Sequence, residues 1–212
     1  MTADAPTNVT IEFERPTSID AVLRTSADVR FLELPPRRYV MIDGNGPPGD
    51  ATFAPRMPGL YATAWTLRFA LKRRGIVTKV GPLEGLWWTA DGTTDLDTIF
   101  APGRDLWRWT LLIGLPEEAA PAEVEMAVAA GRAKLDPELA SGLRARVLDE
   151  GRVAQVLHLG PYAMERATLE RLHGAIAAAG LRPRGRHHEI YLGDPRRSAP
   201  DRLRTILRQP VA

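Results

Sequence analysis

The chain of 212 residues carries 28 basic and 26 acidic side chains, a formal net charge of +2, and it contains no cysteine. The lack of cysteine excludes disulfides, thiolate metal ligands and a cysteine nucleophile. No stretch approaches the roughly 20 apolar residues of a membrane span, and the first residues lack the pattern of a signal peptide, so we expect a cytoplasmic protein without membrane contact.

The basic charge is concentrated near the end of the chain. Residues 182–208 contain eight arginines and three acidic residues, a local net charge of +5 with neutral histidines. Such a segment could meet phosphate groups. However, Pro, Gly and aliphatic residues interrupt the arginines, which favours a solvated rim.

Residues 1–28 form an N-terminal extension. Residues 8–13 are expected to be extended, Pro16 ends that segment, and residues 18–24 favour a short helix. This is too little chain for a DNA-reading module of several packed helices. We therefore expect no direct binding to nucleic acid.

From residue 29 the chain repeats itself. Residues 29–47 (VRFLELPPRRYVMIDGNGP) align without a gap with residues 143–161 (LRARVLDEGRVAQVLHLGP), at a constant offset of 114. Each copy alternates apolar and polar residues on either side of a turn and ends in Gly-Pro, which predicts two strands. A helix with an apolar stripe follows, ending at Gly75 in one copy and at Gly180 in the other.

Two more strands follow each predicted helix. They are expected at residues 83–88 and 106–113, and at residues 188–192 and 203–207. The first copy has two extra features, a Pro/Gly-rich insertion at residues 48–58 and a polar hairpin at residues 89–105.

The chain therefore contains two ββαββ units, at about 29–116 and 143–211, joined by a helical connector at 117–142 whose helix is expected at 121–134. Together they predict one α+β domain over residues 29–212. Its antiparallel sheet carries the helices on one side, with a ligand cleft at the pseudo-twofold junction on the other.

Three familiar motifs are rejected. Residues 44–49 fit the dinucleotide pattern G-x-G-x-x-G, but two prolines lack the amide hydrogens that hold phosphate, and no helix begins directly after them. His187 and His188 would point to opposite faces of a strand, which prevents joint chelation of a metal. No serine lies in a nucleophile elbow. We expect neither a metal nor a cofactor.

Glu189 is the strongest candidate for chemistry. In a strand, Glu189 and Tyr191 face one side while Ile190 and Leu192 face the other. A surface acid paired with a neighbouring arginine is the commoner role for such a residue. A functional role requires that the acid face a cleft. A turn at residues 198–201, with Ser198 as cap, is expected to follow the strand.

Tryptophans gather on the two strands that correspond, by the repeat, to the strands expected at residues 188–192 and 203–207. Packing is the usual role of buried tryptophans. A slot for a flat apolar or cationic ligand would also need such residues. The four are Trp87, Trp88, Trp107 and Trp109.

The string HHEIYLGDPRR at residues 187–197, together with Gly160-Pro161-Tyr162, resembles the GyrI-like small-molecule-binding family, in the subgroup made of this domain alone. The resemblance covers residues 29–211. It implies the duplicated fold and a cleft in which an acid meets lipophilic, often cationic drugs. By position, this acid is Glu189 and the motif's phenol is Tyr191.

The resemblance also implies ligand contacts. Trp88 and Trp109 would stack on the ligand, and Tyr162 would lie near the same junction. Trp87 would replace Trp88 if the strand register slips by one residue, because a slip exchanges the faces. Trp107 shares the face of Trp109 and is a further ligand-binding candidate.

Two functions remain open at this point. Some stand-alone relatives are implied to hydrolyse the cyclopropane ring of duocarmycin-type alkylating compounds, as a detoxification; Glu189 would then be the general base and Tyr191 would assist it. The alternative is a non-catalytic protein that binds or sequesters drugs, or a gyrase-inhibitor-like interaction protein. The fold is compatible with either function.

Overall fold

One antiparallel sheet organises the molecule. The computed structural model describes residues 11–46, 50–91 and 107–212. Within these ranges, eight strands pair in the order β1-β6-β8-β7-β3-β4-β2-β5, and every neighbouring pair is antiparallel. The α+β class is confirmed.

The strands and helices follow the repeated ββαββ order. The first unit contains β1 (Arg30–Leu34), β2 (Arg37–Asn45), α2 (Asp50–Phe53), α3 (Met57–Arg73), β3 (Leu83–Thr89) and β4 (Trp107–Gly114). The second contains β5 (Arg144–Leu148), β6 (Gly151–Leu159), the 3-10 helix η2 (Tyr162–Met164), α7 (Arg166–Ala178), β7 (His187–Tyr191), the 3-10 helix η3 (Pro200–Arg202) and β8 (Arg204–Pro210). The connector holds α5 (Pro121–Arg132) and α6 (Pro137–Ala140), and α1 (Ile19–Val22) precedes both units.

Some expectations differ from these elements in detail. Ser198 does not cap a turn, because η3 begins after Ala199 and has no side-chain cap. Nearly all of the expected hairpin at residues 89–105, and residues 48–49 of the expected insertion, lie outside the described residues.

The two units exchange their first strands. β1 pairs with β6 of the second unit, and β5 pairs with β2 of the first. The offset of 114 relates the pair Arg30–Gln155 to the pair Arg144–Met41, so the exchange obeys the pseudo-twofold symmetry. In the first unit, Pro35 and Pro36 connect β1 to β2; because proline fixes φ near −65°, they cannot form the tight hairpin turn that would pair these strands directly.

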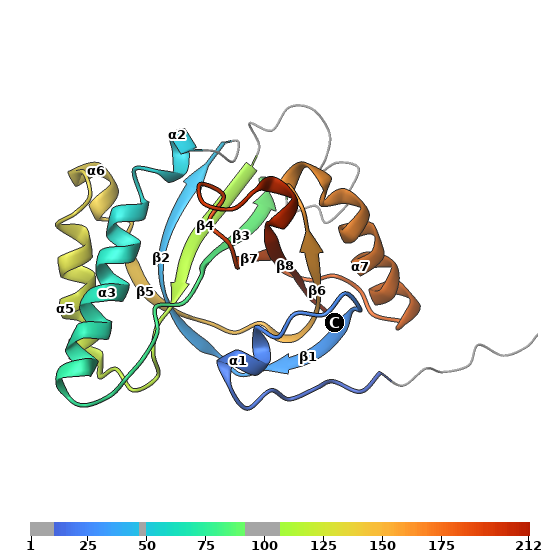
Figure 1. The fold of residues 1–212 in the computed structure, drawn as a ribbon, viewed down its shortest axis with the longest axis horizontal. Coiled ribbons are helices and arrows are strands. Elements are labelled where there is room, and N and C mark those ends of the chain that lie inside the picture. The colour runs from blue at the N-terminus through green and yellow to red at the C-terminus, as the bar shows by residue number, and fades with distance from the viewer. Residues whose placement is uncertain (1–10, 47–49, 92–106) are drawn as a thin grey trace, which may run out of the picture.

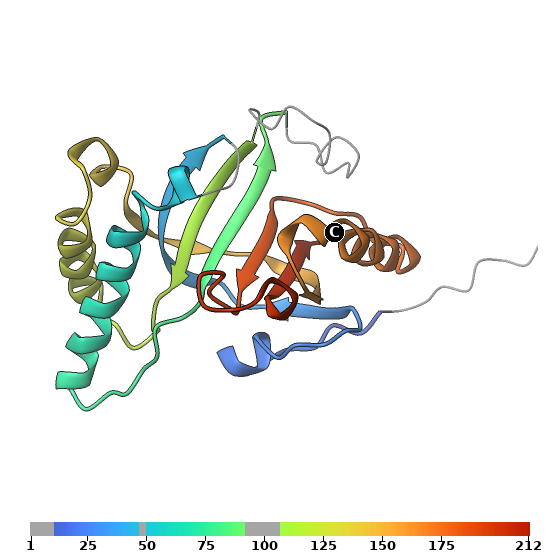
Figure 2. The same cartoon turned by 45° about the horizontal axis from the view of Figure 1, so that its top comes forward.

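The helices of both units cover the same face of the sheet, called here the helical face. In Figure 1, α3 and α5 stand at the left, α7 stands at the right, and β3 and β7 lie between them; the turned view in Figure 2 shows the same separation. The buried stripe of α3 packs on β2 and β4, and consists of Leu60, Ala64, Leu67 and Leu71. The stripe of α7 packs on β6 and β8, and consists of Leu169, Leu172 and Ile176.

The N-terminal extension covers part of the opposite face, called here the open face. Val22 of α1 packs on Leu32, Leu34 and Val153, and the Gln155 side-chain amide donates to the Val22 carbonyl at 2.8 Å. Among the described residues, no helix is both long and apolar enough to span a bilayer.

Gly44 tests the packing of the helical face. The indole of Trp109 lies over Gly44 on the paired strand, and a Cβ added to Gly44 would come within 2.0 Å of that ring. We expect Gly44→Ala to lower the free energy of unfolding by about 1–3 kcal/mol, because the interior has no room for it.

The matched control is Gly174→Ala, on the exposed side of α7, where an added Cβ meets nothing within 4 Å. Since alanine favours a helix over glycine, this variant should gain about 0.5–1 kcal/mol. Urea denaturation measures both. Equal stability of Gly44→Ala and wild type would contradict the packing described.

Candidate functional site

The pairing of β3 with β7 fixes which side chains meet at the centre of the sheet. Gly85 lies opposite Glu189, and Trp87 lies opposite His187. Glu189 lies in one cross-strand row with Leu207, which packs under α7. Glu189 therefore faces the helical side. We expected Glu189 to lie in a cleft on the face without the helices, and this prediction is wrong about the face.

A chain of hydrogen bonds runs across the two strands. The Trp87 indole N–H donates to the Tyr191 oxygen at 3.1 Å, and the Tyr191 hydroxyl donates to Glu189 Oε2 at 2.8 Å. Gly85 leaves the space for it, because an added Cβ would lie 2.8 Å from Trp87 Nε1 and 2.9 Å from Tyr191 Oη. Glu189 and Tyr191 are thus brought together, as their alternation predicts.

Glu189 is poorly hydrated but reachable. About 15% of its side chain is exposed. Burial raises its pKa to about 7, even though the hydrogen bond from Tyr191 and the charge of His188 act to lower it. Glu189 therefore changes its charge near neutral pH, a property of catalytic and ligand-binding acids.

Glu165 is a second acid in this neighbourhood, and the sequence analysis missed it. It is buried at the beginning of α7, and its Oε1 has no hydrogen-bond partner among the described residues. Burial, and secondarily the charge of Glu189, raise its pKa well above the ordinary value. Its place three residues after Tyr162 is the signal that could have drawn attention to it.

The tryptophans divide between the two faces. Trp87, Trp107 and Trp109 lie on the helical face, with the ring centroids of Trp87 and Trp107 5.8 Å apart. Trp88 lies on the open face, where the Arg186 guanidinium covers its ring at 3.6 Å. The structure therefore does not bring Trp88 to Glu189. Trp87 lies on the face of Glu189 instead, as was considered for a slip of one residue in the register.

Trp109 is sealed in the interior. None of its surface is exposed, its ring meets Phe53 edge-on at 4.8 Å, and its indole N–H donates to the Gly46 carbonyl at 3.3 Å. Trp109 therefore belongs to the hydrophobic core under α3 and has no exposed surface with which to contact a ligand. The indole accounts for Gly44, and a positive φ of 86° accounts for Gly46, so neither glycine requires a nucleotide.

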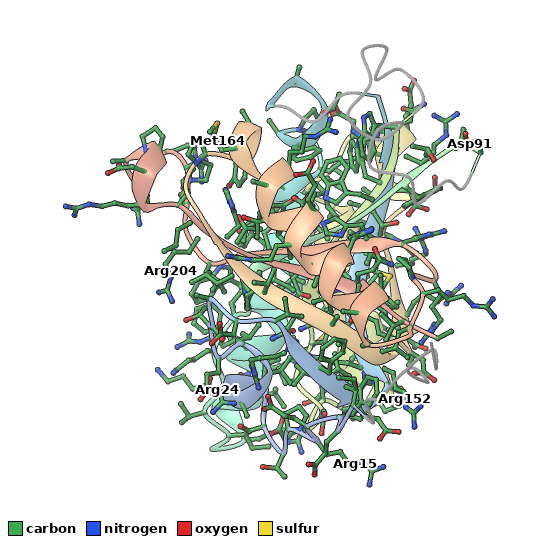
Figure 3. The ribbon with its side chains drawn as sticks, turned by 90° about the vertical axis from the view of Figure 1, so that its right-hand side faces the viewer. Arg15, Arg24, Asp91, Arg152, Met164 and Arg204 are labelled. Carbon is green, nitrogen blue, oxygen red and sulfur yellow. The ribbon has the colours of Figure 1, made fainter. Side chains whose placement is uncertain are left out.

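Tyr162 is brought to the same place. Its ring meets the Tyr191 ring edge-on at 5.8 Å, and it is partly exposed at the beginning of η2. Met164, at the end of η2, protrudes into solvent above α7 in Figure 3. Tyr162, Trp107 and Phe53, whose ring centroid lies 5.8 Å from that of Trp87, are partly exposed aromatic residues beside the hydrogen-bonded chain.

Solved structures resemble this chain along most of its length. A Listeria innocua protein described as an uncharacterized conserved protein is 30% identical, with a TM-score of 0.77, over 92% of this chain and 97% of its own. A hydrolase from Listeria innocua is 28% identical, with a TM-score of 0.73, over 91% and 96%. The EcmrR C-terminal domain, 11% identical with a TM-score of 0.53 over 87% and 97%, shares the fold.

The family model of the GyrI-like small molecule binding domain matches residues 115–211. The chain belongs to the GyrI-like family. The matched residues include the second unit with Glu189 and Tyr191, and the Listeria likeness extends the match to the first unit. This GyrI-like chain is therefore a small-molecule-binding protein by family. A search among curated proteins gives no significant match.

The open face of the GyrI-like domain holds a buried ionic network that the sequence analysis did not anticipate. His188 lies between two acids, with Nε2 2.9 Å from Glu84 and Nδ1 2.9 Å from Glu150. Arg208 donates to Glu150 at 2.9 Å and to the Gln155 side-chain oxygen through two N–H groups, at 3.0 and 2.9 Å. The network joins β3, β6, β7 and β8 and thus both units.

His188 and Glu150 hold one another charged within this network. Burial alone would lower the pKa of His188, but Glu150 and Glu84 outweigh it and raise the pKa to about 9. For Glu150, burial alone would raise the pKa, but His188 and Arg208 lower it to about 2. His188 is therefore an imidazolium at neutral pH and an ion-pair partner. Among the described residues, no group of three or more acids and histidines could hold a metal ion.

The arginine-rich end of the chain is divided between interior and rim. Arg208 is buried in the network. Arg204 lies at the edge in Figure 3, as do Arg15, Arg24 and Arg152. Arg204 donates to the Thr25 hydroxyl at 2.8 Å. Arg208 thus contributes its charge to the interior, while Arg204 remains at the rim.

The raised pKa of Glu189 makes stability depend on pH. A raised pKa favours the neutral acid in the fold, so the stabilisation is full below the ordinary value of 4.5 and is lost as the pH rises through about 7. Glu189→Gln removes this loss. Between about pH 5 and pH 8.5, the stability of the variant relative to wild type should increase by roughly 2–3 kcal/mol.

Urea denaturation at the two pH values measures this difference. Glu170→Gln, a change at an exposed residue of α7, is the control and should show little pH dependence. The same stability difference at both pH values would show that Glu189 titrates normally.

Proposed function

We propose that this GyrI-like protein binds bulky aromatic small molecules on the helical face and hydrolyses the cyclopropane ring of duocarmycin-type alkylating compounds. One observation carries the proposal: a poorly hydrated carboxylate, Glu189, receives a hydrogen bond from Tyr191, which receives one from Trp87. The Listeria innocua protein described as a hydrolase, similar over 91% of this chain, supports the enzymatic assignment.

The reaction needs a general base and a binding surface from which bulk water is excluded. A water molecule attacks the CH₂ carbon of the cyclopropane while Glu189 accepts a proton from the water. The bond from this carbon to the spiro carbon breaks, and its electron pair passes into the dienone, which becomes a phenolate. Solvent returns the proton to the phenolate oxygen, so the net change is addition of one water.

In this proposal the two Glu189 oxygens have different tasks. Oε2 accepts the Tyr191 hydrogen bond, whereas Oε1 lies 3.7 Å from His187 Nε2, beyond hydrogen-bond distance. Burial lowers the pKa of His187 to about 3, so this imidazole is neutral and brings no competing charge. Oε1 is therefore the oxygen that would accept the proton of water.

Tyr191 would act as a positioning residue. Its hydroxyl hydrogen is already engaged with Glu189, so it fixes the carboxylate and does not point to a developing oxyanion. Tyr162 and Trp107 would contact the flat rings of the substrate, because both are partly exposed and lie beside the hydrogen-bonded chain. Trp87 would hold the Tyr191 hydroxyl in place through the hydrogen bond from its indole N–H.

The assay follows the loss of absorbance of a spirocyclopropyl-dienone compound and the mass of its product. We expect Glu189→Gln to lower the turnover rate by about 10²–10⁴-fold, the usual contribution of a general base. The wild-type rate should rise with pH through about 7, because only the ionised carboxylate accepts a proton.

The control variant Glu170→Gln should turn over at the wild-type rate, since Glu170 is exposed on α7. Undiminished turnover by Glu189→Gln would remove Glu189 from the role of base. Saturable binding without turnover by wild type would instead assign the protein to the drug-binding, non-catalytic class.

A further inference from the structure

A cavity of about 370 Å³ lies on the open face, opposite the Glu189 site. It sits at the pseudo-twofold junction, where the turn after β1 and the turn after β5 meet, because Pro35 and Glu150 both line it. The repeat predicts a cleft on this face, but Glu189 does not lie in it. His188 and Glu189 are adjacent in β7 and point to opposite faces, so the two sites are separated by the sheet.

The walls of the cavity are mainly apolar. The N-terminal extension supplies one wall through α1, and the ends of β1 and β5 supply another. The apolar side chains that line it include Ile19, Val22, Leu23, Leu34 and Leu148. For comparison, an apolar cavity of about 150 Å³ holds benzene. A volume of 370 Å³ therefore suits a molecule of about two fused rings.

The floor of the cavity is polar, and one carboxylate oxygen in it accepts no hydrogen bond from the described residues. Both Glu150 oxygens are engaged, one by His188 and one by Arg208. Glu84 is 1% exposed, and its Oε2 lies against His188. Its Oε1 has no hydrogen-bond partner among the described residues, since the Arg37 guanidinium is 3.8 Å away.

The charges around this floor balance. Glu84 and Glu150 are matched by the imidazolium of His188 and the guanidinium of Arg208. At the rim, Arg37, which lies 3.8 Å from Glu84, and Glu117 add one charge of each sign. A charged ligand would upset this balance in a poorly hydrated place, whereas a neutral hydrogen-bond donor would not.

We infer that this cavity is a second ligand site, which binds an uncharged bicyclic aromatic alcohol with its rings against α1 and its hydroxyl donating to Glu84 Oε1. The inference does not depend on the proposed hydrolase activity, because none of the cavity residues belongs to the Glu189 site.

The probe is 2-naphthol, whose own fluorescence reports binding, compared with 2-methoxynaphthalene, which has the same rings and no O–H. We expect saturable binding of 2-naphthol and at least about 10-fold weaker binding of the methoxy compound, since a hydrogen bond to a charged acceptor is lost. Methyl NMR should show shifts at Ile19 and Leu148.

Two variants locate the site by a different route. Ile19→Trp fills the cavity from α1, where Ile19 is 38% exposed, and should weaken 2-naphthol binding by at least about 10-fold. Val77→Trp adds the same indole at a position 86% exposed, outside the cavity, and should bind like wild type.

Any of three results overturns the inference. They are the absence of saturable binding to wild type, equal affinity for the methoxy compound, and methyl shifts confined to the α3 and α7 side of the sheet. The first two are measured on wild type, so the test stands even if Ile19→Trp does not fold.

Discussion

The antiparallel pairing of β3 with β7 decides which side chains reach each face of the sheet. It joins the two repeat units at the centre of the sheet, and its register sets Gly85 opposite Glu189. Because side chains alternate between faces, this register sends Glu189, Tyr191 and Trp87 to the helical face. The same alternation sends His188 and Glu84 to the open face, and a slip of one residue would exchange the two sets.

The two faces use buried charge in opposite ways. On the open face, His188 lies between Glu84 and Glu150, and Arg208 pairs with Glu150, so groups of opposite charge lie beside one another. On the helical face, Glu189 lies near a second acid, Glu165, and burial drives both towards the neutral form. The first arrangement fixes strands of both units in place, whereas the second keeps an acid ready to change its charge.

The sequence predicted what depends on local pattern. The offset of 114 identified both ββαββ units, and strand alternation placed Glu189 and Tyr191 together. It did not predict which face they occupy, because alternation gives only relative orientation. The choice between Trp87 and Trp88 depends on one residue of register. The network of Glu84, Glu150, His188 and Arg208 arises from pairing between distant strands, which no local pattern reveals.

The central claim is that the sheet holds Glu189 in a setting where its carboxyl group titrates near neutrality. The most direct measurement is a ¹³C NMR titration of side-chain carboxyl groups in glutamate-labelled protein, with Glu189→Gln used to assign the Glu189 signal. We expect this signal to titrate near pH 7. A midpoint at the ordinary value of 4.5 would contradict it.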